Sequence, residues 1–175
     1  MVRWLRLPSW LPCALLAWLP GALLAATPSR VVSVVPHLTE LLYDIGAGDR
    51  LVAIDDASDY PAEVKTKPKV ANYRSINVEA LLAQKPDLIL GWRSAQSRML
   101  APLEQLGIPV FYSEPTDFAS LAIEMRALGK LLGVEKSANE AADRYLARLH
   151  GLQRRYGQPT GVKVFYQLWY PPLTS

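Results

Sequence analysis

The chain has 175 residues, half of them hydrophobic, and its 19 basic and 16 acidic side chains give a net charge of +3. Two basic residues, Arg3 and Arg6, stand before the apolar stretch Trp10–Leu24, the layout of a secretory signal peptide, which we place at residues 1–26. The rest of the chain has 17 basic and 16 acidic side chains, a balance that gives no support to nucleic-acid binding, which needs a clustered basic face. The single cysteine, Cys13, lies in the signal peptide, so the exported part has neither a disulfide nor a cysteine-based metal site.

Residues 27–134 alternate between strand and helix patterns. Short apolar or β-branched runs predict strands, and apolar residues at helical spacing between them predict helices. Asn77 and Asp117 are good N-caps for two of these helices. The alternation predicts an α/β lobe with a mostly parallel sheet and helices on both faces. The predicted strands are Arg30–Val35, Leu51–Ile54, Pro68–Asn72, Leu88–Leu90 and Pro109–Tyr112, and the predicted helices are Leu38–Ile45, Asn77–Lys85, Ala95–Leu106 and Asp117–Leu132.

A different pattern follows this lobe. Ser137–Glu140 matches a capping box, and no helix breaker follows until Gly157. We expect one helix over residues 135–157, roughly 30 Å long, that acts as a rigid linker between two lobes. Residues 158–175 would then start a second lobe with a strand at Lys163–Leu168, and the chain would be truncated in that lobe.

Candidate ligand-contacting residues come just after the predicted strands. The carboxyl ends of parallel strands meet at one edge of the sheet, where open α/β sheets bind their ligands. Aromatic side chains offer a large contact area with few torsions to freeze, which suits a broad, flat ligand. The residues placed at this edge are His37, the Asp55–Tyr60 loop, Tyr73, Trp92, Arg93, Glu114, Trp169 and Tyr170.

Other chemistries find less support. Two separated histidines, His37 and His150, make a poor metal site, and Asp55, Asp56 and Asp59 lie in a turn-rich loop where aspartates usually cap. The sequence lacks a Gly-x-Gly-x-x-Gly loop after its first strand and lacks a Gly-x-Ser-x-Gly elbow. We therefore expect a binding protein with no metal or cofactor of its own. The alternative of another class is an exported α/β enzyme that uses His37, Asp55 and Asp59.

Several segments that together cover nearly all of residues 30–175 resemble one known family. The Lys-Pro-Asp-Leu strand with its upstream Asn-x-Glu is the most specific of them. On these segments the chain resembles the periplasmic substrate-binding proteins of the helical-backbone class, which serve ABC importers for cobalamin, haem and iron siderophores. The matching segments are Ser33–Gly46, Ser58–Pro61, Asn77–Glu79, Lys85–Leu90, Leu106–Ile108 and the long helix.

Within this class, Gly91–Ser94 and Gln167–Thr174 look most like the cobalamin-binding members. The resemblance implies a monomeric periplasmic protein whose two lobes clamp a corrin and deliver it to the membrane permease of an ABC importer. Ala57 stands where the family has an aromatic residue before Ser-Asp-Tyr-Pro, which weakens one predicted ligand contact. The positions that match the family's ligand contacts are His37, Tyr73, Trp92 and Leu173, and Arg93 joins them from its place after the strand.

Two further residues gain a role from the resemblance. Glu79 matches a surface carboxylate that docks into arginine pockets of the permease. Tyr73 is near the position from which a tyrosine ligates iron in haem receptors of the same class, so haem is the nearest alternative ligand. The pair Trp92-Arg93 and the segment Gln167–Thr174 favour cobalamin instead. Because one lobe presents only half of the crevice, we expect this chain to bind its ligand weakly.

Overall fold

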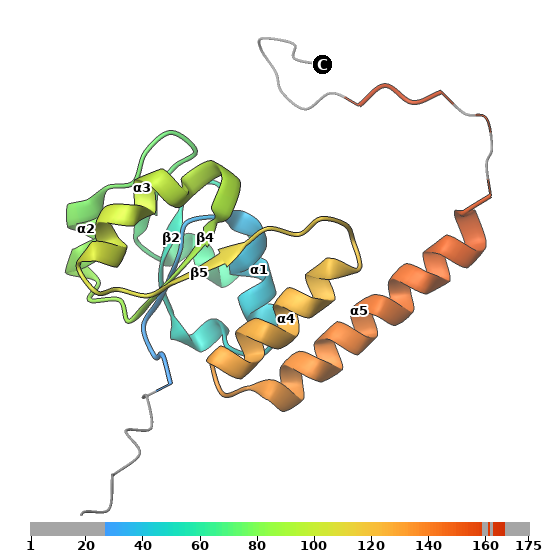
Figure 1. Ribbon diagram of the computed structural model, residues 1–175, viewed down its shortest axis with the longest axis horizontal. Helices are drawn as coiled ribbons and strands as arrows, with labels where there is room; N and C mark the ends of the chain where they lie inside the picture. Colours follow the sequence, from blue (N-terminus) through green and yellow to red (C-terminus); the bar gives the residue numbers. More distant parts are fainter. Residues whose placement is uncertain (1–26, 159–160, 162, 167–175) are drawn as a thin grey trace, which may run out of the picture.

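The computed structural model describes residues 27–158, 161 and 163–166, which form a five-stranded sheet covered by helices (Figure 1). All neighbouring strands are parallel, and their order is β3-β2-β1-β4-β5. The predicted α/β fold with a parallel sheet is therefore confirmed. The strands are β1 (Val31–Ser33), β2 (Leu51–Asp55), β3 (Lys69–Ala71), β4 (Leu88–Trp92) and β5 (Val110–Ser113).

Helices lie on both faces of the sheet, as the alternating pattern predicts. Helices α1, α4 and α5 share one hydrophobic core with the sheet, and α2 and α3 share a second core on the opposite face (Figure 1). None of the helices in the described residues is both long and apolar enough to cross a membrane. The helices are α1 (Pro36–Asp44), α2 (Val78–Ala83), α3 (Arg93–Gln105), α4 (Ser120–Leu131) and α5 (Glu135–Tyr156), with short 3-10 helices η1 (Gly48–Arg50) and η2 (Ala62–Thr66).

The central strands are buried on both faces, and most of their residues are apolar. In β4, Leu88 and Leu90 belong to the core beneath α1 and α4, and Ile89 belongs to the core beneath α2 and α3. Val31 and Val32 divide between the two cores in the same way. Successive side chains of a strand point to opposite faces, so a continuous apolar run is what a strand covered on both sides requires.

Of the two predicted N-caps, the one at Asn77 is confirmed, whereas the N-cap position of α4 is Ala119 and Asp117 lies two residues before it. The side chain of Asn77 accepts a hydrogen bond from the backbone N–H of Ala80 at 2.9 Å and caps α2. The side chain of Asp117 accepts one from the backbone N–H of Ser120 at 2.7 Å, in the turn that leads into α4. These bonds satisfy backbone donors that have no partner within a helix.

The predicted capping box of the long helix is wrong. Helix α5 begins at Glu135, and the hydroxyl of Ser137 in its first turn donates to the backbone oxygen of Ile45 at 2.6 Å. The start of α5 packs so closely on α4 that a Cβ atom added to Gly129 would lie 2.1 Å from the Cβ of Ala138. Small residues thus set the spacing of these two helices.

The later turns of α5 extend away from the sheet (Figure 1). Leu152 and Tyr156 are 50% and 63% exposed there. The strand predicted at Lys163–Leu168 is not formed over residues 163–166, the described part of that range, where the side chains are exposed. The predicted signal peptide, residues 1–26, lies outside the described residues.

Candidate ligand-binding site

The strand order leaves a crevice between the carboxyl ends of β1 and β4. These strands are neighbours, but the chain leaves β1 toward β2 on one side and leaves β4 toward β5 on the other. Open α/β sheets bind ligands where the strand order reverses in this way. His37 follows β1 in the first turn of α1, and Trp92 is the last residue of β4. Their rings meet edge to face with centroids 6.2 Å apart, so the structure brings together two of the predicted ligand contacts.

A buried glutamine fixes the backbone beneath the Trp92 ring. The backbone N–H of Trp92 donates to the side-chain oxygen of Gln96 at 3.0 Å. The side-chain nitrogen of Gln96 donates in turn to the backbone oxygen of Val34 at 2.9 Å. Gln96 therefore ties the end of β4 to the segment that follows β1. The indole ring itself is 44% exposed, which leaves it available to a ligand.

His37 is held by a chain of hydrogen bonds that reaches α4. Its Nε2 atom lies 3.0 Å from the hydroxyl oxygen of Ser113, and that hydroxyl donates to the Glu124 carboxylate at 2.6 Å. The other carboxylate oxygen of Glu124 accepts from the backbone N–H of Glu114 at 2.8 Å. Burial lowers the pKa of the His37 imidazole below its ordinary value, although the negative charges of Glu124 and Asp55 oppose this. The ring is therefore neutral at pH 7.

A cavity of about 230 Å³ opens beside these two rings. It is smaller than the 300–1,000 Å³ of a typical pocket for a small ligand, and most of its lining is apolar or aromatic. Helix α4, the loop before it and α5 supply the wall that faces β1 and β4. The lining residues are His37, Trp92, Pro115, Asp117, Phe118, Leu121 and Tyr145.

Arg93 and Tyr73 do not line this cavity. The guanidinium of Arg93 lies over the ring of Tyr112, 4.7 Å from its centroid. Burial raises the pKa of Tyr112 to about 12, helped by a hydrogen bond to Glu104 and opposed by the charge of Arg93. Tyr73 follows β3, is 63% exposed, and has the guanidinium of Arg74 over its ring at 4.9 Å. Both predicted contacts thus stand outside the cavity, Arg93 with its guanidinium against β5 and Tyr73 after β3.

The remaining predicted site residues lie elsewhere. Glu79 is exposed in the first turn of α2, and Leu173 lies outside the described residues, as do Trp169 and Tyr170. Sequence reasoning missed several residues that complete the cavity or hold His37. The sequence offers only a weak signal for them. One is a serine at the end of a strand, and the others are helix or loop residues that belong to no motif. They are Ser113, Pro115, Phe118, Leu121, Glu124 and Tyr145.

Asp55, the last residue of β2, is hydrogen-bonded to the loop that follows it. The Asp55 carboxylate is buried and accepts from the backbone N–H of Ala57 at 3.0 Å and from the hydroxyl of Ser58. Ser58 also contacts the hydroxyl oxygen of Thr39. Asp59 is exposed. Within the described residues, no group of three or more His, Cys, Asp or Glu side chains is placed to hold a metal ion.

Comparison with known proteins identifies the family. Residues 31–171 match the periplasmic binding protein family, which is most of the chain. The chain belongs to that family. Among curated relatives, the vitamin B12-binding protein of Yersinia pestis is 40% identical over 142 residues, which cover 81% of this chain and 51% of the relative. That of Vibrio campbellii is 35% identical over 144 residues, which cover 82% of this chain and 52% of the relative.

Solved structures of periplasmic binding proteins have the same fold. The crystal structure of the periplasmic vitamin B12-binding protein of Vibrio cholerae matches with a TM-score of 0.78 and 35% identity, over 84% of this chain and 58% of that one. A periplasmic haem-binding protein from Pseudomonas aeruginosa matches with a TM-score of 0.67 and 30% identity, over 75% of this chain and 50% of that one. The chain spans about half the length of the curated relatives it matches.

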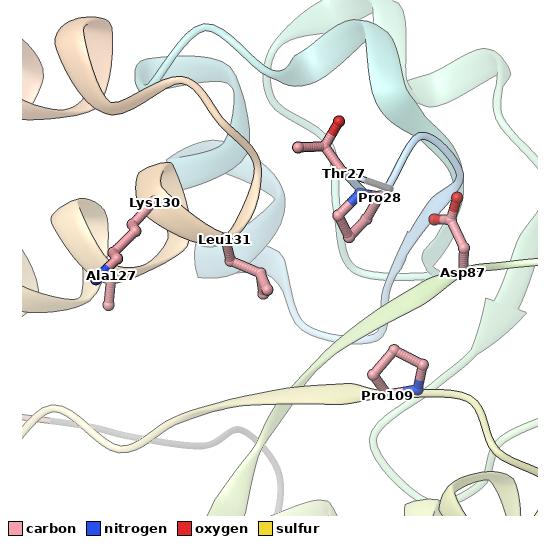
Figure 2. Close-up of a pocket in the computed structure, with 7 residues that line it drawn as sticks. All are labelled: Thr27, Pro28, Asp87, Pro109, Ala127, Lys130 and Leu131. Atoms are coloured by element: carbon pink, nitrogen blue, oxygen red, sulfur yellow. The ribbon is translucent and has the colours of Figure 1, made fainter. Parts of the chain in front are cut away.

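This periplasmic binding protein also has a cavity at the opposite, amino edge of the sheet. It measures about 590 Å³ and lies between the segment before β1, the starts of β4 and β5, and the end of α4 (Figure 2). Asp87 is the one carboxylate in its lining, and both of its oxygens already accept hydrogen bonds from Ser29 and Arg30. The carboxylate that lines this larger cavity is therefore already hydrogen-bonded to other residues of the chain.

Proposed function

We propose that this chain is part of a periplasmic protein that captures a corrinoid, with cobalamin as its ligand, and delivers it to the permease of an ABC importer. The observation that carries the proposal is the pairing of His37 and Trp92 over an apolar cavity at the crevice of the sheet. The relatives named as vitamin B12-binding proteins support the choice of ligand. The role is binding and delivery, not catalysis, and the protein acts as a monomer in the periplasm.

The chemistry of the crevice suits a corrin. A corrin is wide and amphipathic and already holds its metal, so its recognition depends on shape and apolar contact more than on ligating side chains. The half-exposed indole of Trp92 offers a flat apolar surface, and Phe118 and Leu121 extend that surface toward α4. Tyr145 and His37 add polar atoms at its margin.

The affinity expected of this chain is low. Its cavity of about 230 Å³ covers only part of a ligand of that size. The chain also spans about half the length of its curated relatives. Because a ligand that stays largely hydrated gains little from apolar burial, we expect a Kd for cobalamin above about 1 μM.

Titration of the purified chain with cyanocobalamin, followed by calorimetry and by tryptophan fluorescence, tests the proposal. Truncation of Trp92 to alanine should weaken binding at least tenfold, because buried aromatic anchors dominate binding energy. The matched control is Leu106→Ala, which removes an exposed apolar side chain at the far end of α3. Failure of the wild-type chain to bind cobalamin at millimolar concentration, or an equal effect of the two variants, would contradict the proposal.

Haem is the second candidate ligand. The haem-binding relative from Pseudomonas aeruginosa and the exposed Tyr73 ring support it, since a phenol oxygen can ligate haem iron. Titration with haemin separates the two ligands. Under the cobalamin proposal, Tyr73→Phe leaves cobalamin affinity within threefold of wild type. A Tyr73-dependent shift of the haem absorbance, together with no cobalamin binding, would favour haem.

We further propose that Glu79 docks this lobe to the permease. Its carboxylate is exposed at the start of α2, where it is free of the cavity and open to a cationic partner. Contact between exposed charges is screened by salt. Glu79→Gln should therefore weaken association with permease-containing vesicles at low salt, and the exposed Glu140 on α5 offers a control, Glu140→Gln. Equal association of wild type and Glu79→Gln would overturn this assignment.

A further inference from the structure

The hydrogen-bond chain behind His37 has a fixed direction. A carboxylate only accepts hydrogen bonds, and both oxygens of Glu124 are occupied, one by the backbone N–H of Glu114 and one by the hydroxyl of Ser113. The single hydroxyl hydrogen of Ser113 is therefore directed to Glu124. Ser113 is fully buried, so its remaining capacity is for accepting a hydrogen bond from a neighbouring side chain.

That neighbour is the imidazole of His37. Its Nε2 atom lies 3.0 Å from the Ser113 oxygen, and with the hydroxyl hydrogen committed to Glu124, only an N–H at Nε2 can complete this bond. A neutral imidazole carries one hydrogen. The hydrogen at Nε2 therefore leaves Nδ1 as a bare acceptor.

The Nδ1 atom of His37 is not buried. None of the hydrogen bonds within the described residues uses it. Among the same residues, every buried side-chain nitrogen or oxygen has a hydrogen-bond partner, so an unpartnered Nδ1 is not a buried atom. His37 lines the cavity beside Trp92. A ligand in that cavity would thus meet an imidazole nitrogen that accepts hydrogen bonds.

We propose that Ser113 and Glu124 are positioning residues that hold His37 in the Nε2–H tautomer, so that Nδ1 selects ligands carrying an N–H or O–H group. This inference rests on the proposed function and sharpens it. The side chains at the rim of cobalamin are amides, which can donate to Nδ1, whereas the propionates of haem are carboxylates, which cannot. The preference for amide over carboxylate would then be built into the site before any ligand arrives.

The groups around His37 determine how this preference depends on pH. Glu124 from α4 and Asp55 from the end of β2 favour the protonated ring, and Asp117 lines the same cavity. Burial opposes protonation, as does the position of His37 in the first turn of α1, where a cation meets the positive end of the helix dipole. Protonation puts a hydrogen on Nδ1, so acidification should weaken the binding of an amide ligand and favour a carboxylate ligand.

The tautomer can be measured without any ligand. In the ¹⁵N-labelled chain at pH 7.5, long-range ¹H–¹⁵N correlations should show a protonated Nε2 and an unprotonated Nδ1 for His37. The exposed His150 on α5 is the internal reference, expected to average between tautomers, and His150→Gln assigns the two sets of signals. A protonated Nδ1 in the neutral His37 ring would overturn the proposal on wild-type protein alone.

Glu124→Gln tests the direction of the chain. The glutamine oxygen can still accept from Glu114, but its NH₂ group donates to Ser113, which then donates to Nε2 and moves the ring hydrogen to Nδ1. In this variant the ¹⁵N signals of His37 should show a protonated Nδ1 and an unprotonated Nε2, whereas Glu140→Gln should leave both signals unchanged. Unchanged His37 signals in a Glu124→Gln variant that keeps the wild-type amide spectrum would overturn the proposal.

A matched pair of ligands tests the selectivity. Cyanocobalamin is compared with a corrin whose side-chain amides have been hydrolysed to carboxylates. Loss of one hydrogen bond should shift the ratio of the two affinities about three- to tenfold toward the carboxylate in Glu124→Gln. An unchanged ratio would overturn the role of Nδ1 in selection. Absence of binding of either corrin to wild type would instead contradict the proposed function, and the tautomer measurement would still decide the positioning role.

Discussion

The two edges of the sheet use the same kinds of polar side chain for different purposes. At the amino edge, Asp87 accepts hydrogen bonds from the backbone N–H groups of Ser29 and Arg30, each at 2.8 Å. The guanidinium of Arg30 donates to the backbone oxygens of Gln84 and Lys85. Polar side chains at this edge thus form hydrogen bonds with the chain's own backbone. These bonds hold the segment before β1 against the loop before β4.

At the carboxyl edge, polar side chains bond to one another as well as to the backbone. His37, Ser113 and Glu124 form one such chain, while the ring of Trp92 stays partly exposed beside them. The cavity there is the smaller of the two, about 230 Å³ against about 590 Å³. The proposed ligand edge is therefore distinguished by its exposed aromatic surface and by side chains oriented by a buried network, and not by the volume of its cavity.

The largest loss of stability is expected from Asp87→Ala. Removing a charged acceptor of three hydrogen bonds at a partly exposed position should cost about 2 kcal/mol of the free energy of unfolding. Urea denaturation measures this loss, with Glu140→Ala as an exposed carboxylate control. Ligand affinity should stay unchanged. A parallel loss of cobalamin binding would show that the amino edge also contributes to the site and would break the contrast between the edges.

The pH dependence of the same residue sharpens that test. Burial by itself raises the pKa of the Asp87 carboxyl, but the hydrogen bonds from Ser29 and Arg30 outweigh burial and lower the pKa below its ordinary value. A lowered folded-state pKa stabilises the fold above the unfolded-state pKa of about 3.9, and this contribution disappears as the pH falls through the folded value. The difference in unfolding free energy between wild type and Asp87→Ala should therefore be constant from pH 7 to 5 and shrink below pH 4. A difference that stays constant down to pH 2 would contradict this origin.

Most of the fold could be predicted because its signals are local. Apolar strands such as Leu88–Leu90, the cap at Asn77 and the stops at Gly107 and Gly133 act within a few residues, and both glycines adopt the positive φ that favours glycine after a helix. The predicted helix over residues 135–157 matches α5, but the capping box predicted at Ser137–Glu140 is wrong, and for a different reason. The hydroxyl of Ser137 bonds to Ile45, a contact between distant parts of the sequence that a capping pattern cannot reveal.

The residues of the candidate site also divide into those that the sequence predicts and those that only the structure reveals. His37 and Trp92 could be predicted because parallel strands bring their carboxyl ends to one edge, whatever the details of packing. Ser113 and Glu124 could not, since their contact depends on how α4 lies against β5. Tyr145 enters the cavity from α5, and nothing in its neighbours distinguishes it from other residues that pack the helix. Strand ends can thus be read from the sequence, whereas the helix wall opposite them requires the structure.

A smaller effect on stability is expected from Phe118→Ala at the carboxyl edge. Phe118 is 76% exposed although it lines the cavity, so its removal should change the free energy of unfolding by less than about 0.5 kcal/mol. Cobalamin affinity should fall about three- to tenfold, because the ring would lose its contact with the ligand. Ile123→Ala, which removes a side chain that is 68% exposed on α4, serves as the control for both measurements. Large destabilisation by Phe118→Ala would show that this edge, too, serves the fold.

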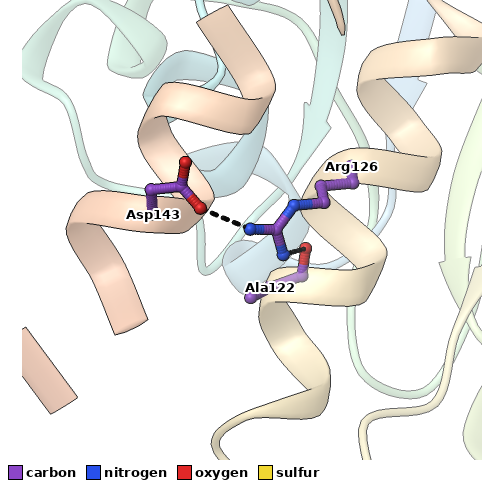
Figure 3. Close-up of polar contacts among 3 residues, drawn as sticks. All are labelled: Ala122, Arg126 and Asp143. Atoms are coloured by element: carbon purple, nitrogen blue, oxygen red, sulfur yellow. Dashed lines mark hydrogen bonds and ion pairs between the residues drawn. The ribbon is translucent and has the colours of Figure 1, made fainter. Parts of the chain in front are cut away.

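The smallest effect on stability is expected from the ion pair between α4 and α5. This pair belongs to neither edge, so it serves as a reference for the hydrogen bonds at both edges. Nη2 of Arg126 lies 2.6 Å from a carboxylate oxygen of Asp143 (Figure 3). This distance equals the 2.6 Å between the Ser113 hydroxyl and the Glu124 carboxylate at the carboxyl edge. The side chains of the ion pair are 37% and 71% exposed, however, so water and salt screen their attraction. In a double-mutant cycle of Arg126→Met and Asp143→Asn, the coupling should be about 0.5 kcal/mol in 0.1 M salt and smaller in 1 M salt.

Asp87 and Asp143 would then differ about fourfold in their effect on stability, although each accepts a short hydrogen bond at the surface. The reason is the partner: Asp87 binds backbone N–H groups that the fold holds in place, whereas Arg126 must freeze a long side chain to reach Asp143. A coupling above about 2 kcal/mol that persists in 1 M salt would contradict this reasoning. The distinction between an edge that fastens the chain and an edge that binds a ligand would then need a criterion other than the nature of the hydrogen-bond partner.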